Sequence, residues 1–529
     1  MNQQLRKSLA PMLVVAALLL AGCTGLGNST TTLQGVVAIG GPLPGASVTV
    51  VDFNGLKRST KANAQGAYSV DVDGMSAPLL VSAIEAGPNT NCRYNATLRA
   101  RCMAALLASL HAGNNIGNVN PLTDRIASDV AVELKFIGPQ QFVDSGKSAG
   151  DAQQIAAATR TMQAGFKSAL KEAGVANADN FDPVSTPMQA DHTGVDAVLD
   201  VINHNRNYDN PTSESSYTVL TDISFRPIVG LVGSGPYEPL DFKRAQKELN
   251  EFRNAKVRVL VAGDSTGATY EVERLPRKGW GQVFEEQFKA DSGVKVINAS
   301  RAGRSSKDLY NGGWYQQMSR FMQKGDYVLI NLGHNDQNCE LLKKERGPAD
   351  VAGLCSYPND ANGKLQYPEG HPEMSFQKSL ERYVSEARAA GAIPVIITPT
   401  TRVWNEARQE GFPVVPNHYT SAKTGVGFAY VGDYSQTVKD TARANKVPLI
   451  DLEAKTIVFV NAHQADWKDY WLAVADKVKY PYYATQATGT FEKPDVAHFQ
   501  EKGAQVMAAL VADGIRETPE LKPLAQLLR

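Results

Sequence analysis

The chain has 529 residues, which is too long for one ordinary domain, so we expect two to four folded units. Lys and Arg together number 54, as do Asp and Glu, so the formal net charge is zero and nothing indicates nucleic acid or an anionic membrane surface as a partner. Hydrophobic content of 43% with 20% charged residues is typical of a soluble globular protein, and it excludes a disordered chain or one that crosses a membrane many times.

The amino terminus has the pattern of an export signal. Two basic residues precede an apolar run over 12–20, which is shorter than a membrane span but has the length of a signal-peptide core. The run ends in Leu-Ala-Gly-Cys, which resembles the bacterial lipoprotein cleavage box. This resemblance implies a signal peptide over 1–22 and a lipid anchor at Cys23, while an ordinary signal peptide with a chance cysteine is the alternative. Because Thr24 stands where an inner-membrane retention signal would usually have Asp, the resemblance implies an outer-membrane lipoprotein that faces the periplasm or the cell surface.

The other four cysteines fit an exported protein. Cys92 and Cys102 are close in sequence, as are Cys339 and Cys355, and each pair lies within one expected domain. We therefore expect two disulfides, formed in an oxidising compartment, and free buried thiols are the alternative. No Cys-x-x-Cys motif occurs and the eight histidines are scattered, so we expect no structural zinc site.

Two units are expected before residue 256. A tether rich in Ser and Thr over 23–33 leads into short alternating strands broken by Gly and Pro, which predict a small β-sandwich over 34–102. This stretch resembles the carboxypeptidase regulatory-like module, which implies a spacer, with carbohydrate binding as the alternative. Helical periodicity then dominates 103–255, where no motif carries chemistry; the expected helices include 104–110, 126–134, 153–173 and 194–202.

Strands and helices alternate over 256–529. This order is typical of a parallel sheet with helices on both faces, and right-handed crossovers place the carboxyl ends of all its strands at one edge. The first strand contains four apolar residues in five positions, as strands buried on both faces do. Expected strands are 257–262, 294–298, 327–331, 393–398 and 448–451, and expected helices are 282–290, 376–390, 434–444 and 500–512.

Three groups needed for nucleophilic catalysis lie in loops of this last domain. Ser265 follows the first strand within Gly-Asp-Ser-Thr, and Asp495 and His498 lie just before the final helix. A serine nucleophile needs a base to accept its proton and a carboxylate to orient that base. Because Asp495 and His498 are three positions apart, they can share one turn, so that Nδ1 of the histidine faces the carboxylate and Nε2 faces the serine.

Two further loops offer donors for an oxyanion. The loop after the second strand contains Gly303, whose missing Cβ lets its backbone N–H point into a crowded site. The loop after the third strand is Gly-His-Asn-Asp, in which Asn335 offers a neutral amide. Gly-x-Ser-x-Gly is absent around Ser265, which argues against the elbow of the α/β-hydrolases, and the chain order Ser, Asp, His is not that of subtilisin.

These blocks resemble the SGNH (GDSL-type) hydrolases, with Ser265, Gly303, Asn335 and His498 in the family's order. The similarity is closer to the rhamnogalacturonan and pectin acetylesterases and covers essentially all of 256–515. It extends through Gly-Trp-Gly-Gln at 279–282, Gly-Arg-Ser-Ser at 303–306, Lys-Gly-Asp-Tyr-Val at 324–328, Thr-Pro at 398–399 with Arg402, and Val-Pro-Leu-Ile-Asp-Leu at 447–452. One departure is Ala497, where that branch usually has Thr.

The resemblance implies a fold and a set of roles. The fold is a three-layer α/β/α SGNH hydrolase with a flavodoxin-like parallel sheet, preceded by the β-sandwich and the helical unit. Ser265, Asp495 and His498 would be catalytic. The oxyanion hole would consist of the N–H groups of Ser265 and Gly303 with the Asn335 amide, and no metal or organic cofactor would be required. Expected substrate contacts are Trp280, Arg304, His334 and Arg402, since aromatic faces stack on sugar rings and arginines pair with uronate carboxylates.

The implied function is that of a serine esterase which removes O-acetyl groups from pectic polysaccharide, rhamnogalacturonan or homogalacturonan, through an acetyl-enzyme. The partners would be this acetylated substrate and, through Cys23, a membrane. One alternative is an esterase of the same superfamily that acts on acetylated xylan, peptidoglycan or lipid acyl esters. The other is a lipid-anchored carbohydrate-binding protein whose hydrolase domain is inert.

Overall fold

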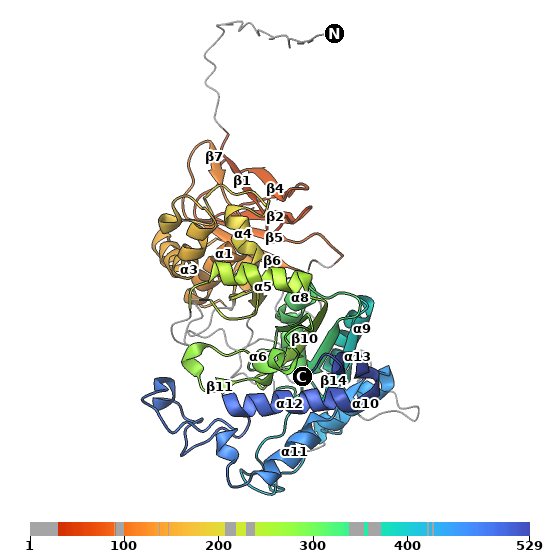
Figure 1. Cartoon of the computed structure of the whole chain (residues 1–529). Helices are drawn as coiled ribbons and strands as arrows, with labels where there is room; N and C mark the ends of the chain where they lie inside the picture. The colour runs from red at the N-terminus through yellow and green to blue at the C-terminus, as the bar shows by residue number, and fades with distance from the viewer. Residues whose placement is uncertain are drawn as a thin grey trace, which may run out of the picture.

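The computed structural model describes residues 30–88, 90, 92, 100–136, 138–146, 148–206, 218–228, 238–337, 354–357, 372–420, 423–425 and 428–529. The expected signal peptide, Cys23 and Cys339 lie outside these residues. A β-rich part occupies one end of the molecule and the α/β domain the other, with helices between them (Figure 1). None of the described helices has the length and apolar composition needed to cross a membrane.

The β-rich part contains two sheets. Apolar residues on their facing surfaces, such as Val48, Val50 and Val81, are completely buried in a common core. This alternation of buried and exposed positions is what a small sandwich requires. One sheet has the order β4-β1-β7 and the other β3-β2-β5-β6, and their strands are β1 (Thr32–Val36), β2 (Ser47–Val51), β3 (Lys57–Lys61), β4 (Ala67–Asp71), β5 (Leu79–Ile84), β6 (Cys102–Leu107) and β7 (Asn114–Ile116).

The helix expected over 104–110 is wrong, because this segment continues β6, which pairs antiparallel with β5. Ala105 of β6 packs into the sandwich core, whereas Ala104 and Leu106 face the opposite side and pack with the helices. A strand covered on both faces is apolar throughout, so its sequence shows no alternation that would distinguish it from a helix. The β-rich part therefore extends past the expected boundary at 102, and it begins at Thr32, two residues inside the expected tether.

The segment that follows is mainly helical. The helices expected over 126–134, 153–173 and 194–202 are confirmed as α1, α3 and α4, while an antiparallel hairpin of β8 and β9 was not predicted. Asn120 begins α1 by accepting two backbone hydrogen bonds through its side chain, and Asp151 begins α3 by accepting one. The elements are α1 (Pro121–Glu133), α2 (Pro139–Asp144), α3 (Ala152–Glu172), α4 (Gly194–Asp200), β8 (Ile202–Arg206), β9 (Thr218–Asp222) and α5 (Phe242–Asn254).

The α/β domain is built on five parallel strands in the order β12-β10-β13-β14-β17. Numbered along the domain, this order is 2-1-3-4-5, the flavodoxin-like arrangement. All five strands were predicted, and they are β10 (Val257–Gly263), β12 (Val294–Asn298), β13 (Tyr327–Asn331), β14 (Ile393–Ile397) and β17 (Leu449–Ile450).

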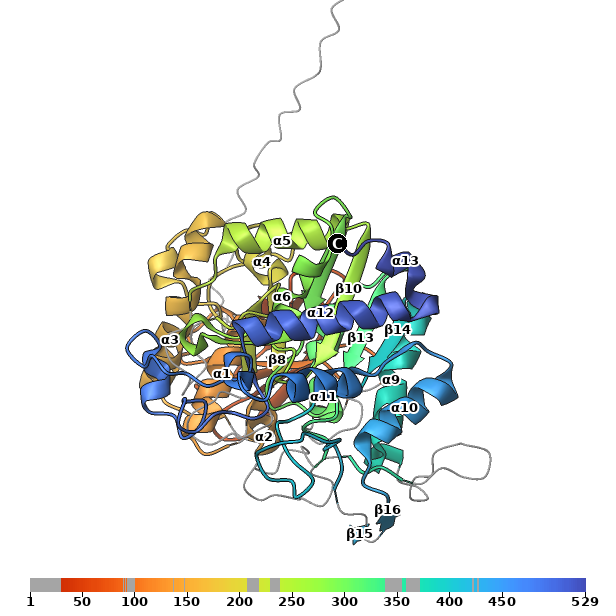
Figure 2. The ribbon, with the colours of Figure 1, turned by 60° about the horizontal axis from the view of Figure 1, so that its bottom comes forward.

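Helices cover both faces of this sheet. Figure 2 shows α12 and α11 lying across β10, β13 and β14 on the near side. Val261 and Met507 share the core under α12, whereas Leu260 of the same strand belongs to the core of the opposite face. The helices are α6 (Trp280–Val283), α7 (Ser306–Asn311), α8 (Trp314–Ser319), α9 (Phe376–Ala389), α10 (Tyr434–Asn445), α11 (Leu452–Ala462), α12 (Glu501–Glu517) and α13 (Lys522–Ala525); short strands outside the main sheet are β11 (Arg277–Lys278) with β18 (Phe499–Gln500), and β15 (Lys423–Gly425) with β16 (Phe428–Tyr430).

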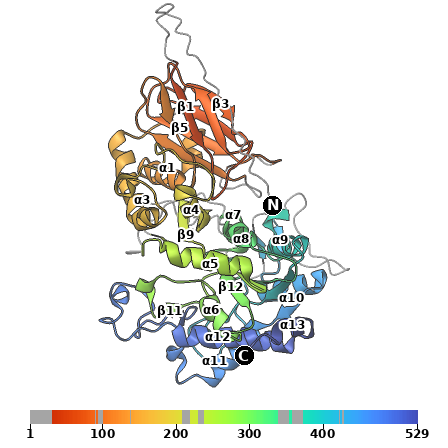
Figure 3. The ribbon, with the colours of Figure 1, turned by 45° about the horizontal axis from the view of Figure 1, so that its top comes forward.

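The core on that opposite face continues into the N-terminal half of the chain. It joins Leu106 of β6 and Ile126 of α1 to Leu260 of β10 and Trp314 of α8. Figure 3 shows α5 between the N-terminal elements and β12. Cys92 and Cys102 form the expected disulfide, and Cys355 is also disulfide-bonded.

Candidate active site

Ser265 lies in the turn that follows β10. From β10 the chain passes to β12 on one side and later to β13 on the other, so the carboxyl end of β10 is the switch point at which open sheets bind ligands. The Nε2 atom of His498 is 2.8 Å from Oγ of Ser265, and its Nδ1 atom is 2.7 Å from Oδ2 of Asp495. The structure thus brings together the three side chains that the sequence places at opposite ends of the domain.

The turn between Asp495 and His498 explains this geometry. Oδ1 of Asp495 accepts the backbone N–H groups of Ala497 and His498 at 2.9 and 3.1 Å, which leaves Oδ2 for the imidazole. The carbonyl of Leu472 accepts from the N–H of Asp495, and the N–H of Leu472 donates to the carbonyl of His498, both at 2.8 Å. Since only the backbone of residue 497 takes part, Ala in place of Thr leaves the turn intact.

The electrostatic environment favours a neutral histidine beside an ionised aspartate. Burial and the positive charge of Arg277 lower the pKa of His498 below its ordinary value, although Asp495 acts in the opposite direction. Burial alone would raise the pKa of Asp495, but the hydrogen bond and attraction from His498 and the N–H of Ala497 hold that pKa below its ordinary range. At neutral pH His498 therefore has an unprotonated nitrogen that faces the Ser265 hydroxyl.

Two neighbouring groups hold the turn that carries the serine. Oδ1 of Asp264 accepts both the backbone N–H and the hydroxyl of Thr266 at 2.9 Å. The hydroxyl of Tyr270 donates to the backbone carbonyl of Ser265 at 2.7 Å. Burial raises the pKa of Asp264 to about 6. These contacts fix the backbone from which the serine side chain projects.

The two loops expected to supply oxyanion donors are joined to each other. The backbone N–H of Arg301 donates to the carbonyl of Gly263 at 3.1 Å, which places the loop of Gly303 beside the end of β10. Gly303 has φ of +75°, a backbone conformation that glycine adopts without strain. The side-chain amide of Asn335 donates to the carbonyl of Arg304 at 3.0 Å and so connects the third-strand loop to the second.

The expectation that Trp280 contacts substrate is wrong. Its side chain is completely buried, and its indole N–H donates to Oδ1 of Asn331 at 3.2 Å. A large aromatic ring serves a core as well as it serves a sugar-binding surface, and a single sequence does not separate the two uses. Trp314 and Trp471 are completely buried as well.

Of the other three expected substrate contacts, two lie inside the protein and Arg402 is partly exposed. Arg304 and His334 are buried, and Nη1 of Arg304 donates to the carbonyl of Ala302 at 3.2 Å. Arg402 follows β14, and its guanidinium donates to the carbonyl of His334 at 3.4 Å. The loop of Arg402 is itself held beside the aspartate–histidine turn, because the N–H of Val403 donates to the carbonyl of Val496 at 3.0 Å.

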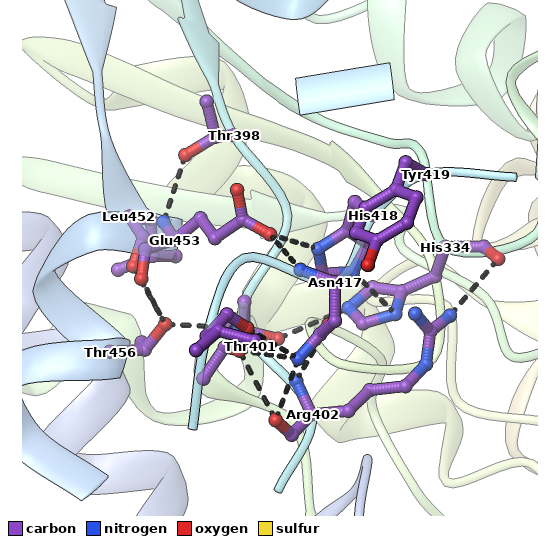
Figure 4. A network of polar contacts seen from close by, with 12 residues as sticks. His334, Thr398, Thr401, Arg402, Asn417, His418, Tyr419, Leu452, Glu453 and Thr456 are labelled. Atoms are coloured by element: carbon purple, nitrogen blue, oxygen red, sulfur yellow. Dashed lines mark hydrogen bonds and ion pairs between the residues drawn. The ribbon is translucent and has the colours of Figure 1, made fainter. Parts of the chain in front are cut away.

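The structure adds residues that the sequence did not single out. His418 contacts His334 on one side and Glu453 on the other, and the amide of Asn417 donates to the carbonyl of Arg402 at 2.8 Å (Figure 4). Glu453 lies just beyond β17, at the edge of the sheet where the strands end, and this position is the sequence signal that could have found it. His418 follows no predicted strand, and no motif surrounds it. Among the described side chains, no three His, Cys, Asp or Glu residues gather in a way that would hold a metal ion.

Serine, histidine and aspartate in hydrogen-bond contact at the carboxyl edge of an open parallel sheet form an arrangement that can carry out nucleophilic catalysis. The chain belongs to the GDSL-like lipase/acylhydrolase family, whose match covers residues 261–506. This membership supports a carboxylic ester hydrolase.

Several relatives of the α/β domain are known. The chain is 30% identical over 261 residues to the rhamnogalacturonan acetylesterase RhgT of Bacillus subtilis, a match that covers 49% of this chain and 90% of that protein. It is 34% identical over 197 residues to a rhamnogalacturonan acetylesterase of Emericella nidulans, with 36% of this chain and 73% of that protein covered. A solved structure of an acetylxylan esterase from Geobacillus stearothermophilus, a catalytic mutant, is 17% identical with a TM-score of 0.27, and it covers 49% of this chain and 94% of that one.

Proposed function

We propose that this protein is a serine esterase that removes O-acetyl groups from a pectic polysaccharide. The observation that carries the proposal is the contact of His498 with both Ser265 and Asp495, at 2.8 and 2.7 Å. The acetyl group and the polysaccharide class are supported by relatives named as rhamnogalacturonan acetylesterases in two organisms.

The first half of the proposed reaction acylates the serine. Oγ of Ser265 attacks the acetyl carbonyl carbon while its proton passes to Nε2 of His498, and Asp495 stabilises the imidazolium that forms. The backbone N–H groups of Ser265 and Gly303 and the amide of Asn335 stabilise the negative carbonyl oxygen. The bond to the sugar oxygen then breaks, and His498 returns the proton to that oxygen.

The second half releases acetate. A water molecule gives a proton to His498 and attacks the acetyl-enzyme, and the ester bond to Ser265 breaks as its oxygen regains a proton. The sum is one ester and one water consumed for one sugar hydroxyl and one acetic acid, so the residues described need no redox partner. A neutral His498 with an ionised Asp495 is the protonation state that this sequence of steps requires.

The test measures acetate released from acetylated rhamnogalacturonan, homogalacturonan and xylan by the wild-type chain and by Ser265→Ala. We expect the variant to lose activity by on the order of 10⁴-fold or more, since the nucleophile is removed. Ser59→Ala, a change on exposed β3, is the matched control and should retain full activity. Release of acetate at the wild-type rate by Ser265→Ala would remove the nucleophile assignment, and release from xylan alone would remove the pectic substrate.

Two inexpensive assays separate the alternatives. An esterase for lipid acyl chains needs an extended apolar groove, so it would hydrolyse an octanoyl ester at least as well as an acetyl ester. An inert binding protein would not react with a fluorophosphonate. We expect acetyl preference and covalent labelling that Ser265→Ala abolishes.

We also propose that the chain is exported and anchored through a lipid at Cys23, in the outer membrane. The support is the lipoprotein-like sequence over 20–23 together with the Cys92–Cys102 disulfide, since disulfides persist in oxidising compartments. Mass spectrometry of the amino-terminal peptide tests this: an unmodified residue 23, or an uncleaved segment 1–22, would contradict it.

A further inference from the structure

Three buried ionisable side chains form a chain of hydrogen bonds beside the candidate active site. Oε1 of Glu453 is 2.6 Å from Nδ1 of His418, and Nε2 of His418 is 3.2 Å from Nδ1 of His334. The ring of His334 reaches further to the hydroxyl of Thr400, at 3.2 Å from Nε2. Figure 4 shows that these groups come from separate segments of the chain, with Glu453 in the first turn of α11 and His418 between it and His334. The proposed reaction gives none of them a role.

The charge of Glu453 sets the direction of every bond in this chain. Burial would raise the pKa of Glu453, but the hydrogen bond and attraction from His418 keep it below its ordinary value, so the carboxylate is ionised and accepts. Burial lowers the pKa of His418 to about 4, so this ring is neutral at pH 7 and uses its single N–H, on Nδ1, for the carboxylate. Its Nε2 atom is therefore an acceptor.

The protonation state of the next ring, His334, follows in the same way. Burial, His418 and Arg402 lower the pKa of His334 well below its ordinary value, so His334 is also neutral. Because Nε2 of His418 accepts, Nδ1 of His334 carries the proton and donates. Nε2 of His334 is then an acceptor, which suits the hydroxyl of Thr400. The rings pack edge to face with their centroids 4.4 Å apart, so neither can rotate alone.

His334 is directly adjacent to the proposed oxyanion donor. Its carbonyl accepts from Arg402, the following Asn335 amide donates to Arg304, and Asp336 accepts the N–H and hydroxyl of Ser306 at 2.9 and 2.7 Å. Three successive residues of this loop are thus held by three different partners. The His334 ring is a further attachment of this loop, through its contacts with His418 and Thr400.

We propose that Glu453 and His418 are positioning residues for the oxyanion loop: they hold His334 in one tautomer and one orientation, and thereby hold the Asn335 amide where the tetrahedral intermediate forms. The inference rests on the proposed function. Two buried imidazoles and a buried carboxylate are expensive to desolvate compared with apolar side chains of equal volume. Their hydrogen bonds fix which nitrogen of each ring donates and how the His334 ring is oriented.

The decisive change is Glu453→Gln, which preserves shape but removes the charge. The amide of glutamine can either accept from Nδ1 of His418 or donate to it, so both tautomers of His418 become available and His334 loses its defined partner. We expect kcat for an acetyl ester to fall about tenfold, within the limit of the roughly 10²–10³-fold loss that follows removal of an oxyanion donor outright, with KM unchanged. Glu248→Gln, a partly buried carboxylate bonded to Arg226 and Ser224 far from this loop, is the matched control and should leave kcat unchanged.

A second measurement does not depend on the variant. Nitrogen-15 spectra of histidine-labelled wild-type protein distinguish the two neutral tautomers, and we expect both His418 and His334 to carry the proton on Nδ1. The opposite arrangement, with His334 donating through Nε2 to Thr400, requires a doubly protonated His418. The titratable and charged groups that face His418 are Glu453, His334, Arg402 and Arg408, and the two arginines oppose a second proton on this ring. A wild-type His334 protonated on Nε2 at pH 7 overturns the proposal, as does full kcat in Glu453→Gln.

Parallel variants distinguish this failure from failure of the proposed function. If Ser265→Ala retains activity, the esterase mechanism itself is wrong. If Ser265→Ala is inactive and Asn335→Ala is reduced on the order of 10²-fold or more, while Glu453→Gln has the wild-type kcat, only the positioning role is wrong.

Discussion

The two halves of the chain each contain a histidine bonded to an aspartate, and this pair is buried in the N-terminal half but partly exposed in the α/β domain. In the N-terminal half, Nε2 of His204 is 2.9 Å from Oδ2 of Asp124, and in the α/β domain Nδ1 of His498 is 2.7 Å from Oδ2 of Asp495. Burial lowers the pKa of both histidines, that of His204 to about 4. The pair itself therefore does not identify a catalytic site.

The two pairs differ in the other groups that they contact. Asp124 is enclosed: its Oδ2 also accepts from Arg206 and from the hydroxyl of Thr218 at 2.7 Å, while Oδ1 accepts the N–H of Ala104 at 2.8 Å. These partners lie on strands β6, β8 and β9, so the network connects β6 and α1 to the β8–β9 hairpin. The second nitrogen of His498 faces a serine hydroxyl at a strand end instead. We infer that one arrangement fixes the fold and the other transfers protons.

The largest expected effect comes from replacing the aspartate of the second pair. Asp495→Asn preserves size but can present an amide N–H to His498, which favours the wrong tautomer, so kcat should fall on the order of 10⁴-fold. The free energy of unfolding should change little in comparison. Steady-state kinetics with a chromogenic acetyl ester and urea unfolding together check this, and a loss of kcat below tenfold would contradict the catalytic role inferred for Asp495 and His498.

The matching change in the first pair should act on stability. Asp124→Asn removes the buried carboxylate that accepts from His204, Arg206 and Thr218, and breaking a buried pair in this way costs about 3–5 kcal/mol in the free energy of unfolding. The folded fraction should keep its kcat, because the network does not touch the site. Urea unfolding with activity normalised to folded protein measures both. Unchanged stability together with reduced kcat would reverse the roles assigned to the two halves.

The smallest expected effect is on the pH at which kcat/KM begins to fall on the acid side. The proposed base must be unprotonated, and the pKa of His498 is lowered, so kcat/KM should remain level down through the ordinary histidine value near 6.5 and fall tenfold per pH unit only below its own pKa. A pH–rate profile between pH 4 and 8 measures the limb. A limb above pH 7, or no limb, would be inconsistent with the environment of this histidine.

Regular parts of the fold were predictable because each carries its own periodic signal. The five strands of the main sheet are short apolar runs, and Ser265, Asp495 and His498 could be brought together in advance because parallel strands share a carboxyl edge. β6 was not predictable, since apolar contacts on both faces erase the alternation. The burial of Trp280 and the position of His418 beside the site were not predictable for another reason. Whether an aromatic ring belongs to the core or to the site depends on partners far away in sequence.

Leu106, Ile126, Leu260 and Trp314 share one apolar interior across what the sequence suggested as a boundary at residue 256. Separating the halves would expose hydrocarbon to water on both sides of the cut, at roughly 25 cal/mol for each Å² uncovered. The N-terminal half is therefore no hinged stalk. The shared core therefore fixes the direction in which the Ser265 edge of the sheet points relative to the β-rich end of the molecule.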